Sequence, residues 1–172
     1  KGQGGTVRLC PVCVVREPGD IAIVISYVLE YKKAGNSKSN DQKAGRYHMQ
    51  QALLEHLRKI TEEEQRILDG IAEVDRDLYT SGKDFTVDSA KMLSEGKLIA
   101  VRTHTRFVHF PSHRHNFIEV LYVCQGQLTN IIGGKEVVLR QGELLFLNQF
   151  TRHEILPAGE EDIAINFMIL PE

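Results

Sequence analysis

The sequence has only three cysteines in 172 residues and no long apolar run. The longest such run, Ile21–Leu29, is less than half of the roughly 20 residues that a transmembrane helix needs, and no small-residue cleavage site of a signal peptide follows it. Three cysteines without a secretion signal do not predict a disulfide framework. We therefore expect a cytoplasmic, reducing location and no membrane partner.

An excess of either charge is also missing, because 21 basic side chains face 23 acidic ones. Such a balance does not generate the electrostatic field that draws proteins to nucleic acids or anionic membranes. The hydrophobic content of 42% is nevertheless enough for a real core. These features predict one globular unit with appendages.

Residues 1–48 form a basic, polar N-terminal extension, with the linker-like stretch Lys32–Arg46 at its end. Two interpretations stay open: a variable native extension, or non-native upstream sequence if Met49 is the true start. Cys10 and Cys13 have the spacing of a zinc knuckle or redox pair, but no second pair completes either site. We assign no function to them.

Residues 49–80 have helical spacing and predict two short helices. Leu53, Leu54, Leu57 and Ile60 form the apolar stripe of the first helix. Thr61 and Glu64 form a capping box at the start of the second helix. Acidic residues outnumber basic ones here, and three glutamates occupy the second helix's first turn, which disfavours a helix-turn-helix. We expect the stripe to serve interdomain or dimer packing.

Residues 81–172 predict a β-barrel or sandwich, because from about Leu98 short segments rich in Val, Ile, Phe and Thr alternate with turns. The predicted turns are Pro111–Ser112, Gln125–Gly126, Gly133–Gly134, Gln141–Gly142 and 157–160. Cys124 lies in an apolar segment, as expected of a small buried hydrophobic residue. His104 and His109 have opposite parity, so at most one of them should face the interior, and we interpret both as structural.

The strongest constellation reads HxHx3Ex6G followed by Gx10H, with His113, His115, Glu119 and Gly126, then Gly142 and His153. Residues 113, 115 and 119 share parity and can face one side, and His153 can approach from a neighbouring strand. Three imidazoles and a carboxylate suit a divalent metal such as Zn, Fe, Mn, Ni or Cu. They can equally line a metal-free polar pocket, and ligand binding is the interpretation that we favour.

At these residues the sequence resembles the cupin superfamily, which implies a jelly-roll β-barrel in which the same four side chains are the candidate metal ligands. Four positions depart from the usual cupin motifs. Phe107 stands where a glycine usually opens the first motif, Asn148 and Phe150 replace the usual proline and glycine of the second motif, and Pro157 stands where that motif usually ends in asparagine.

From about Met49 onward, the phrases KITEEEQRILDG, RTHTRFVHFPSHRHNFIEVLYVCQG, GELLFLNQ and DIAINFMILPE resemble the sensor half of AraC-family transcription regulators. The resemblance implies a domain that binds a small effector, often a sugar, and forms a homodimer. It also implies that DNA is bound only by a C-terminal helix-turn-helix domain that these residues do not include.

The sequence therefore predicts a non-enzymatic effector-binding module, with His113, His115, Glu119 and His153 as ligand-binding residues and as candidate ligands of a divalent metal (Zn, Mn, Fe or Ni). The alternative is a metal-dependent cupin enzyme, an isomerase or a dioxygenase. No further acid or base beyond the four residues stands out, which favours the binding module. A stand-alone sugar-binding cupin is a third reading.

Overall fold

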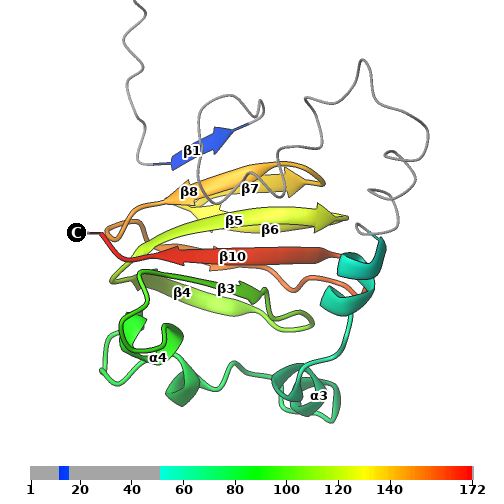
Figure 1. Ribbon diagram of the computed structural model, residues 1–172, viewed down its shortest axis with the longest axis horizontal. Coiled ribbons are helices and arrows are strands. Elements are labelled where there is room, and N and C mark those ends of the chain that lie inside the picture. Colours follow the sequence, from blue (N-terminus) through cyan, green and yellow to red (C-terminus); the bar gives the residue numbers. More distant parts are fainter. Residues whose placement is uncertain (1–11, 16–50, 172) are drawn as a thin grey trace, which may run out of the picture.

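The structure is a computed structural model that describes residues 12–15 and 51–171. Ten strands form two five-stranded sheets, in the orders β1-β8-β5-β10-β3 and β2-β4-β9-β6-β7, which lie one behind the other in Figure 1. The strands are β1 (Val12–Val15), β2 (Thr86–Val87), β3 (Ile99–Thr103), β4 (Phe110–His115), β5 (Ile118–Gln125), β6 (Gln127–Ile132), β7 (Lys135–Arg140), β8 (Leu144–Leu147), β9 (His153–Ile155) and β10 (Ile163–Ile169). The predicted mainly β fold is confirmed.

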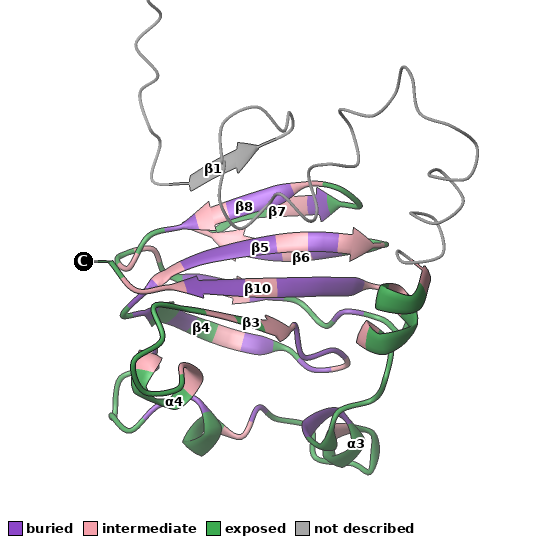
Figure 2. Cartoon of the chain, in the orientation of Figure 1, coloured by how far each residue is buried: buried purple, intermediate pink, exposed green. Residues whose placement is uncertain are grey.

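The core lies between the two sheets because alternate side chains of each strand point inward. On β5, Leu121 and Val123 are buried in the main apolar cluster, whereas Val120 belongs to a second cluster. That second cluster lies on the other face of the first sheet, where Phe167 of β10 is buried. Figure 2 shows this burial along the central strands. Both faces of this sheet are therefore apolar, as the nearly continuous apolar sequence of β5 predicts.

Four of the five predicted turns connect consecutive strands or precede β10, but the turn at Pro111–Ser112 is wrong. Both residues lie inside β4, where the pairing of β4 with β9 shifts register between Phe110 and His113. A register irregularity of this kind accommodates proline in a sheet, because it interrupts the ladder hydrogen bonds that proline cannot donate. Proline therefore marks a bulge here and not a chain reversal.

Two short helical segments precede the barrel, as predicted: residues 51–57 and α3 (Glu62–Leu68). Thr61 caps α3, and its capping box with Glu64 is complete, since each side chain accepts a hydrogen bond from the other residue's backbone amide. The residues of the predicted apolar stripe differ in burial. Leu57 packs against the outer cluster of the first sheet, while Leu53 and Ile60 stay exposed.

The interval after α3 contains elements that the sequence did not predict: the 3-10 helix η1 (Arg76–Leu78), the strand β2 and the helix α4 (Ser89–Met92). β2 pairs in parallel with β4, so this interval adds an edge strand to the second sheet. Asp75 and Asp88 cap the two short helices through their side chains. Because those side chains compete well for backbone amides, such short helices can form without strong periodicity.

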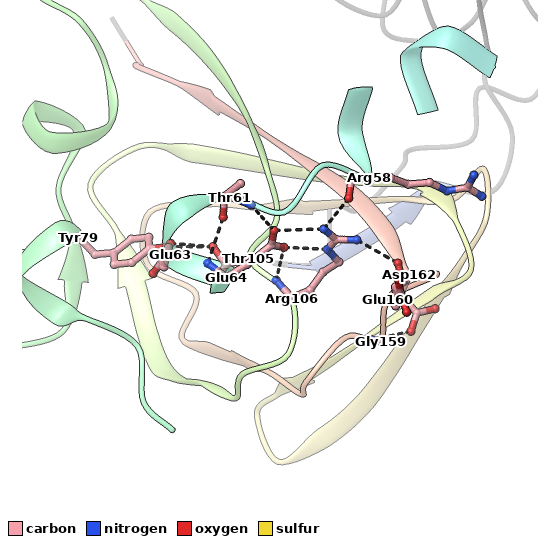
Figure 3. A network of polar contacts seen from close by, with 10 residues as sticks. All are labelled: Arg58, Thr61, Glu63, Glu64, Tyr79, Thr105, Arg106, Gly159, Glu160 and Asp162. Carbon is pink, nitrogen blue, oxygen red and sulfur yellow. Dashed lines mark hydrogen bonds and ion pairs between the residues drawn. The ribbon is translucent and has the colours of Figure 1, made fainter. Parts of the chain in front are cut away.

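The helix α3 is joined to the barrel by a buried ion pair that Figure 3 shows. The Glu64 carboxylate accepts hydrogen bonds from Arg106 Nε (2.7 Å) and Nη2 (3.1 Å) and from the Arg106 backbone amide (3.1 Å). The remaining guanidinium donors reach the carbonyl oxygens of Arg58 and Glu160. From the sequence, the glutamates of α3 only disfavoured a helix-turn-helix; the structure shows that Glu63 and Glu64 are buried and accept hydrogen bonds from barrel residues.

Within residues 51–171, no helix is long and apolar enough to cross a membrane. β1 belongs to the predicted N-terminal extension, and its backbone pairs antiparallel with β8. The other predictions for residues 1–48, which concern Cys10, the polar linker and the origin of this segment, lie outside the described residues.

Candidate functional site

Three of the four predicted site residues come together on the second sheet. His113 of β4 and His153 of β9 are register partners, and His115 lies two residues further along β4. The ring centroids of His113 and His153 are 4.2 Å apart, and one ring nitrogen from each of the three histidines lies within 4.8 Å of the other two. All three side chains are buried, so the cluster is held by the core and not by surface loops.

The fourth residue, Glu119, approaches from β5 of the opposite sheet. Its Oε2 atom lies 3.5 Å from the Nε2 atoms of both His115 and His153, while its Oε1 atom accepts a hydrogen bond from Asn166 Nδ2 at 2.9 Å. Among the described residues, neither Glu119 Oε2 nor His153 Nε2 has a hydrogen-bond partner. Buried polar atoms without a partner are costly, so this point between the sheets is suited to receive a ligand.

Neighbouring groups fix the orientation of two histidine rings. His113 donates from Nδ1 to the carbonyl oxygen of Pro111 at 2.8 Å, and His153 donates from Nδ1 to Asn130 Oδ1 at 3.0 Å. On His153 the contact leaves the lone pair on Nε2 free, 3.5 Å from Glu119 Oε2. Outer contacts of this type orient histidine ligands in metal sites, so the donor set fits a divalent metal. The three histidines could hold such an ion.

Burial determines the charge of the cluster. It lowers the pKa of His113 to about 4 and lowers the pKa values of His115 and His153 well below their usual range, with a further lowering from the neighbouring histidines. Burial also raises the pKa of Glu119 to about 8, against the opposing effect of the Asn166 hydrogen bond. At neutral pH the imidazoles are neutral, which is the form that binds metals and accepts hydrogen bonds.

A cavity of about 40 Å³ opens beside the cluster. It has room for about three water molecules and is smaller than typical ligand pockets of about 300 Å³ or more. Its wall contains apolar, aromatic, hydroxyl and charged side chains, namely Tyr79, Val87, Met92, Arg102, Thr103, His104, Thr105, Phe110, His113, His115, Phe117, Glu119, Ile155, Asn166 and Met168. In its described shape, the cavity suits a small polar ligand better than a sugar ring.

Sequence reasoning missed several polar residues of this wall. Tyr79 comes from the segment after α3, and Arg102 and Asn166 are register partners on β3 and β10. Parity along each strand could have indicated Arg102 and Asn166 once the strand faces were known. Tyr79 carries no comparable signal, because it follows the irregular helix η1.

His104 and His109, whose opposite parity assumed one extended strand, lie instead in the connection between β3 and β4 and differ in burial. His104 is buried in the cavity wall, its Nε2 atom has no partner among the described residues, and burial lowers its pKa to about 4. His109 is exposed, and its Nε2 atom lies 3.2 Å from Glu154 Oε2. The prediction that at most one of them faces the interior is confirmed, and His104 lies closer to the candidate site than the sequence indicated.

Cys124 is a half-buried free thiol on β5, and burial raises its pKa to about 12. A thiol in that state is a poor nucleophile, so the interpretation of Cys124 as a small hydrophobic residue agrees with its surroundings. The side chains of Cys10 and Cys13 lie outside the described residues.

Phe107 supports the alignment with the cupin motif. Its φ angle of 68° lies in the left-handed region, and no other non-glycine residue in the described part of the chain has a positive φ. This is the position at which the first cupin motif usually has glycine, the residue that adopts this conformation without strain. The backbone therefore keeps the geometry although the side chain has changed.

Residues 95–171 match the family model for the AraC-like ligand binding domain. Together with the two facing sheets, this match identifies the fold as cupin-like. No curated protein matches the chain.

Similar solved structures include an RmlC-like cupin from Shewanella frigidimarina, with 21% identity over 43% of this chain and 68% of that chain and a TM-score of 0.36. An HTH_3-family transcriptional regulator from Vibrio cholerae has 21% identity over 43% of both chains and a TM-score of 0.36. A salicylate 1,2-dioxygenase from Pseudaminobacter salicylatoxidans has 11% identity over 41% of this chain and 20% of that chain, with a TM-score of 0.35.

Proposed function

We propose that this chain is the effector-binding part of a transcription regulator, and that a small polar molecule binds in the cavity beside His113, His115, Glu119 and His153. The observation that carries this proposal is the pair of buried, unpartnered atoms, Glu119 Oε2 and His153 Nε2, between the two sheets. They lie within the stretch that matches the AraC-like ligand binding domain. A ligand that bonds to both atoms offsets the cost of desolvating them.

The regulator role has two further parts. Leu53 and Ile60 are exposed on and just after the helical residues 51–57, which supports a homodimer contact through this stripe. DNA contact would be made by a helix-turn-helix domain outside these residues. Sedimentation of the chain at increasing concentration tests the dimer, with Leu53→Ser as the variant that should weaken it. A strict monomer at all concentrations contradicts this part.

The main experiment measures thermal stabilisation and calorimetric binding with a panel of sugars, polyols and small acids. Wild type is compared with Glu119→Gln and His153→Ala, and His109→Ala serves as an exposed control histidine. We expect at least one compound to bind wild type and the control, and each site variant to weaken its binding by about 1–3 kcal/mol, the cost of an unpaired buried polar group. Equal binding by all four proteins would refute the site.

A metal-dependent enzyme is the second candidate, favoured by the three ring nitrogens within 4.8 Å of one another. His113, His115, His153 and Glu119 would hold the ion, which when bound supplies Lewis-acid polarisation of a ligand oxygen. Glu119 and the histidines provide the donor atoms, and Pro111 and Asn130 keep two of the rings oriented. Elemental analysis of the purified chain before and after chelation, with turnover assays on the compounds that bind, separates this candidate from a binding module.

A further inference from the structure

Arg102 is a cation in the cavity wall with little to neutralise it. It lies on β3 opposite Asn166, and both side chains line the cavity. Its Nη1 atom contacts Met92 Sδ at 2.9 Å, and its Cζ atom lies 5.4 Å from the centre of the Tyr79 ring. A thioether is a weak acceptor and an aromatic face a weak attractor, so neither replaces an anionic partner.

Arg102 takes part in none of the ion pairs in the described part of the chain, so no carboxylate oxygen there lies within 4.0 Å of its guanidinium nitrogens. Arg106, four residues later, is fully paired by comparison, because its guanidinium donates hydrogen bonds to the Glu64 carboxylate and to two carbonyl oxygens. A guanidinium has five N–H donors. Most of those on Arg102 therefore remain available to a ligand.

The other charged groups of the wall do not compete for Arg102. Glu119 is the one carboxylate among the lining residues, and its oxygens face Asn166 and the histidines. Glu63 lies outside the wall and accepts hydrogen bonds from Tyr79 (2.7 Å) and Thr105 (3.1 Å), as Figure 3 shows. Arg102 is thus the one arginine or lysine that lines the cavity, and the one carboxylate of the wall, Glu119, contacts other residues.

We propose that the effector is a small carboxylic acid whose carboxylate pairs with Arg102 while its other polar atoms face the histidine cluster. This inference rests on the proposed function and specifies its ligand class. A planar carboxylate matches the guanidinium fork with two parallel hydrogen bonds. With a volume of about 40 Å³, room for about three water molecules, the cavity in its described shape restricts the ligand to a small acid.

The test uses the full chain and four probes at constant ionic strength: acetate and pyruvate as acids, and acetamide and glycerol as uncharged compounds of similar size. Inorganic phosphate is a fifth probe, since it also matches the guanidinium fork. Binding is measured by calorimetry and by the shift in melting temperature at about 10 mM probe, enough to saturate a site with a Kd of about 1 mM. We expect at least one acid to bind more tightly than its uncharged counterpart and more tightly than phosphate.

Arg102→Gln should weaken binding of that acid by about tenfold or more, the loss expected for a charge-assisted hydrogen bond. Arg102→Lys should retain part of the affinity, because the charge stays and the fork is lost. Arg140→Gln, at an exposed position on β7, is the matched control and should change nothing. Circular dichroism confirms that each variant folds, and Glu119→Gln reports separately on the histidine side of the cavity.

Three outcomes overturn the proposal: no acid binds, an acid binds equally to wild type and a folded Arg102→Gln, or phosphate binds best. If glycerol or acetamide binds in a manner sensitive to Glu119→Gln but not to Arg102→Gln, the effector site stands and its anionic specificity is wrong. If an acid binds with sensitivity to Arg102→Gln but not to Glu119→Gln, the anion site stands and the role of the histidine cluster is wrong.

Discussion

The buried pair of Glu64 and Arg106 allows a sharp prediction about stability. Both side chains are almost completely inaccessible, at 0% and 1% exposure, and Glu64 makes hydrogen bonds to three donors of Arg106 and to the Thr61 amide. Glu64→Ala leaves the guanidinium charge buried without its partner. Removing one member of such a pair costs about 3–5 kcal/mol, which in a chain of this size lowers the melting temperature by about 6–20 °C.

The assay is urea unfolding followed by circular dichroism at pH 7, with Glu62→Ala as the matched control. Glu62 lies in the same first turn of α3 but is exposed, so its loss should cost at most about 1 kcal/mol. The double variant Glu64→Leu/Arg106→Met removes both charges and should lose clearly less than the sum of the single changes. A cost for Glu64→Ala within about 1 kcal/mol of the control would refute the reasoning.

The same unfolding experiment, repeated at several pH values, tests the charge state of Glu64. Burial alone would raise the pKa of this carboxyl group, but hydrogen bonds from Arg106 and from the Thr61 and Arg106 amides and the positive charge of Arg106 lower it overall. A lowered folded-state pKa contributes stability that is complete above the unfolded value of about 4.3 and is lost as the pH falls through the folded value. The stability gap between wild type and Glu64→Gln should therefore shrink below about pH 4.

Three further predictions concern other parts of the chain. Unfolding free energy should fall as the pH drops from about 6.5 towards 4, because the unfolded chain takes up protons on four histidines whose folded pKa values burial lowers. This loss should outweigh the opposite effect of Glu119, whose raised pKa of about 8 gives a stabilising contribution that grows as the pH falls from about 8 towards 4.5. Urea unfolding at several pH values measures the profile, and a flat one contradicts the prediction. Gly126→Ala should destabilise the fold by about 2 kcal/mol more than Gly134→Ala. Both glycines have a positive φ, but only at Gly126 would an added Cβ collide with other atoms, those of Asp162 and the Glu161 carbonyl. Equal melting temperatures of the two variants would contradict this. In a Cys10→Ser/Cys13→Ser variant, Cys124 should react with a disulfide reagent at pH 8 far more slowly than free cysteine does, because burial raises its pKa to about 12. A reaction as fast as that of free cysteine would show that the thiol is accessible.

The sequence predicted those parts of the fold that depend on local patterning. The capping box of α3 could be predicted from Thr61 and Glu64 alone. Glycines predicted three of the turns between strands, and the composition of residues 157–160 predicted the turn before β10. The Pro111–Ser112 turn failed because proline also occurs at bulges, and local sequence does not distinguish the two contexts. η1 and α4 were missed because a helix of one turn has too few residues to show periodicity.

The candidate site was predicted in part. His113 and His153 meet as strand partners, and Glu119 faces them from the other sheet, although the parity argument had treated His113 and Glu119 as neighbours on one extended chain. Arg102 and Tyr79 were not predicted, because their places in the wall depend on packing between elements that are distant in sequence. The partnership of Glu64 with Arg106 was missed for the same reason, since the two residues are 42 positions apart.

Nitrogen-15 spectra of the histidine rings test the central claim most directly. The chain has seven histidines, and the compound from the panel that stabilises the chain most is added in steps. The account predicts that the ring nitrogens of His113, His115 and His153 shift together and saturate with the calorimetric affinity, while those of the exposed His56 and His109 stay unchanged. Saturating binding that leaves the three buried rings unperturbed would contradict the account.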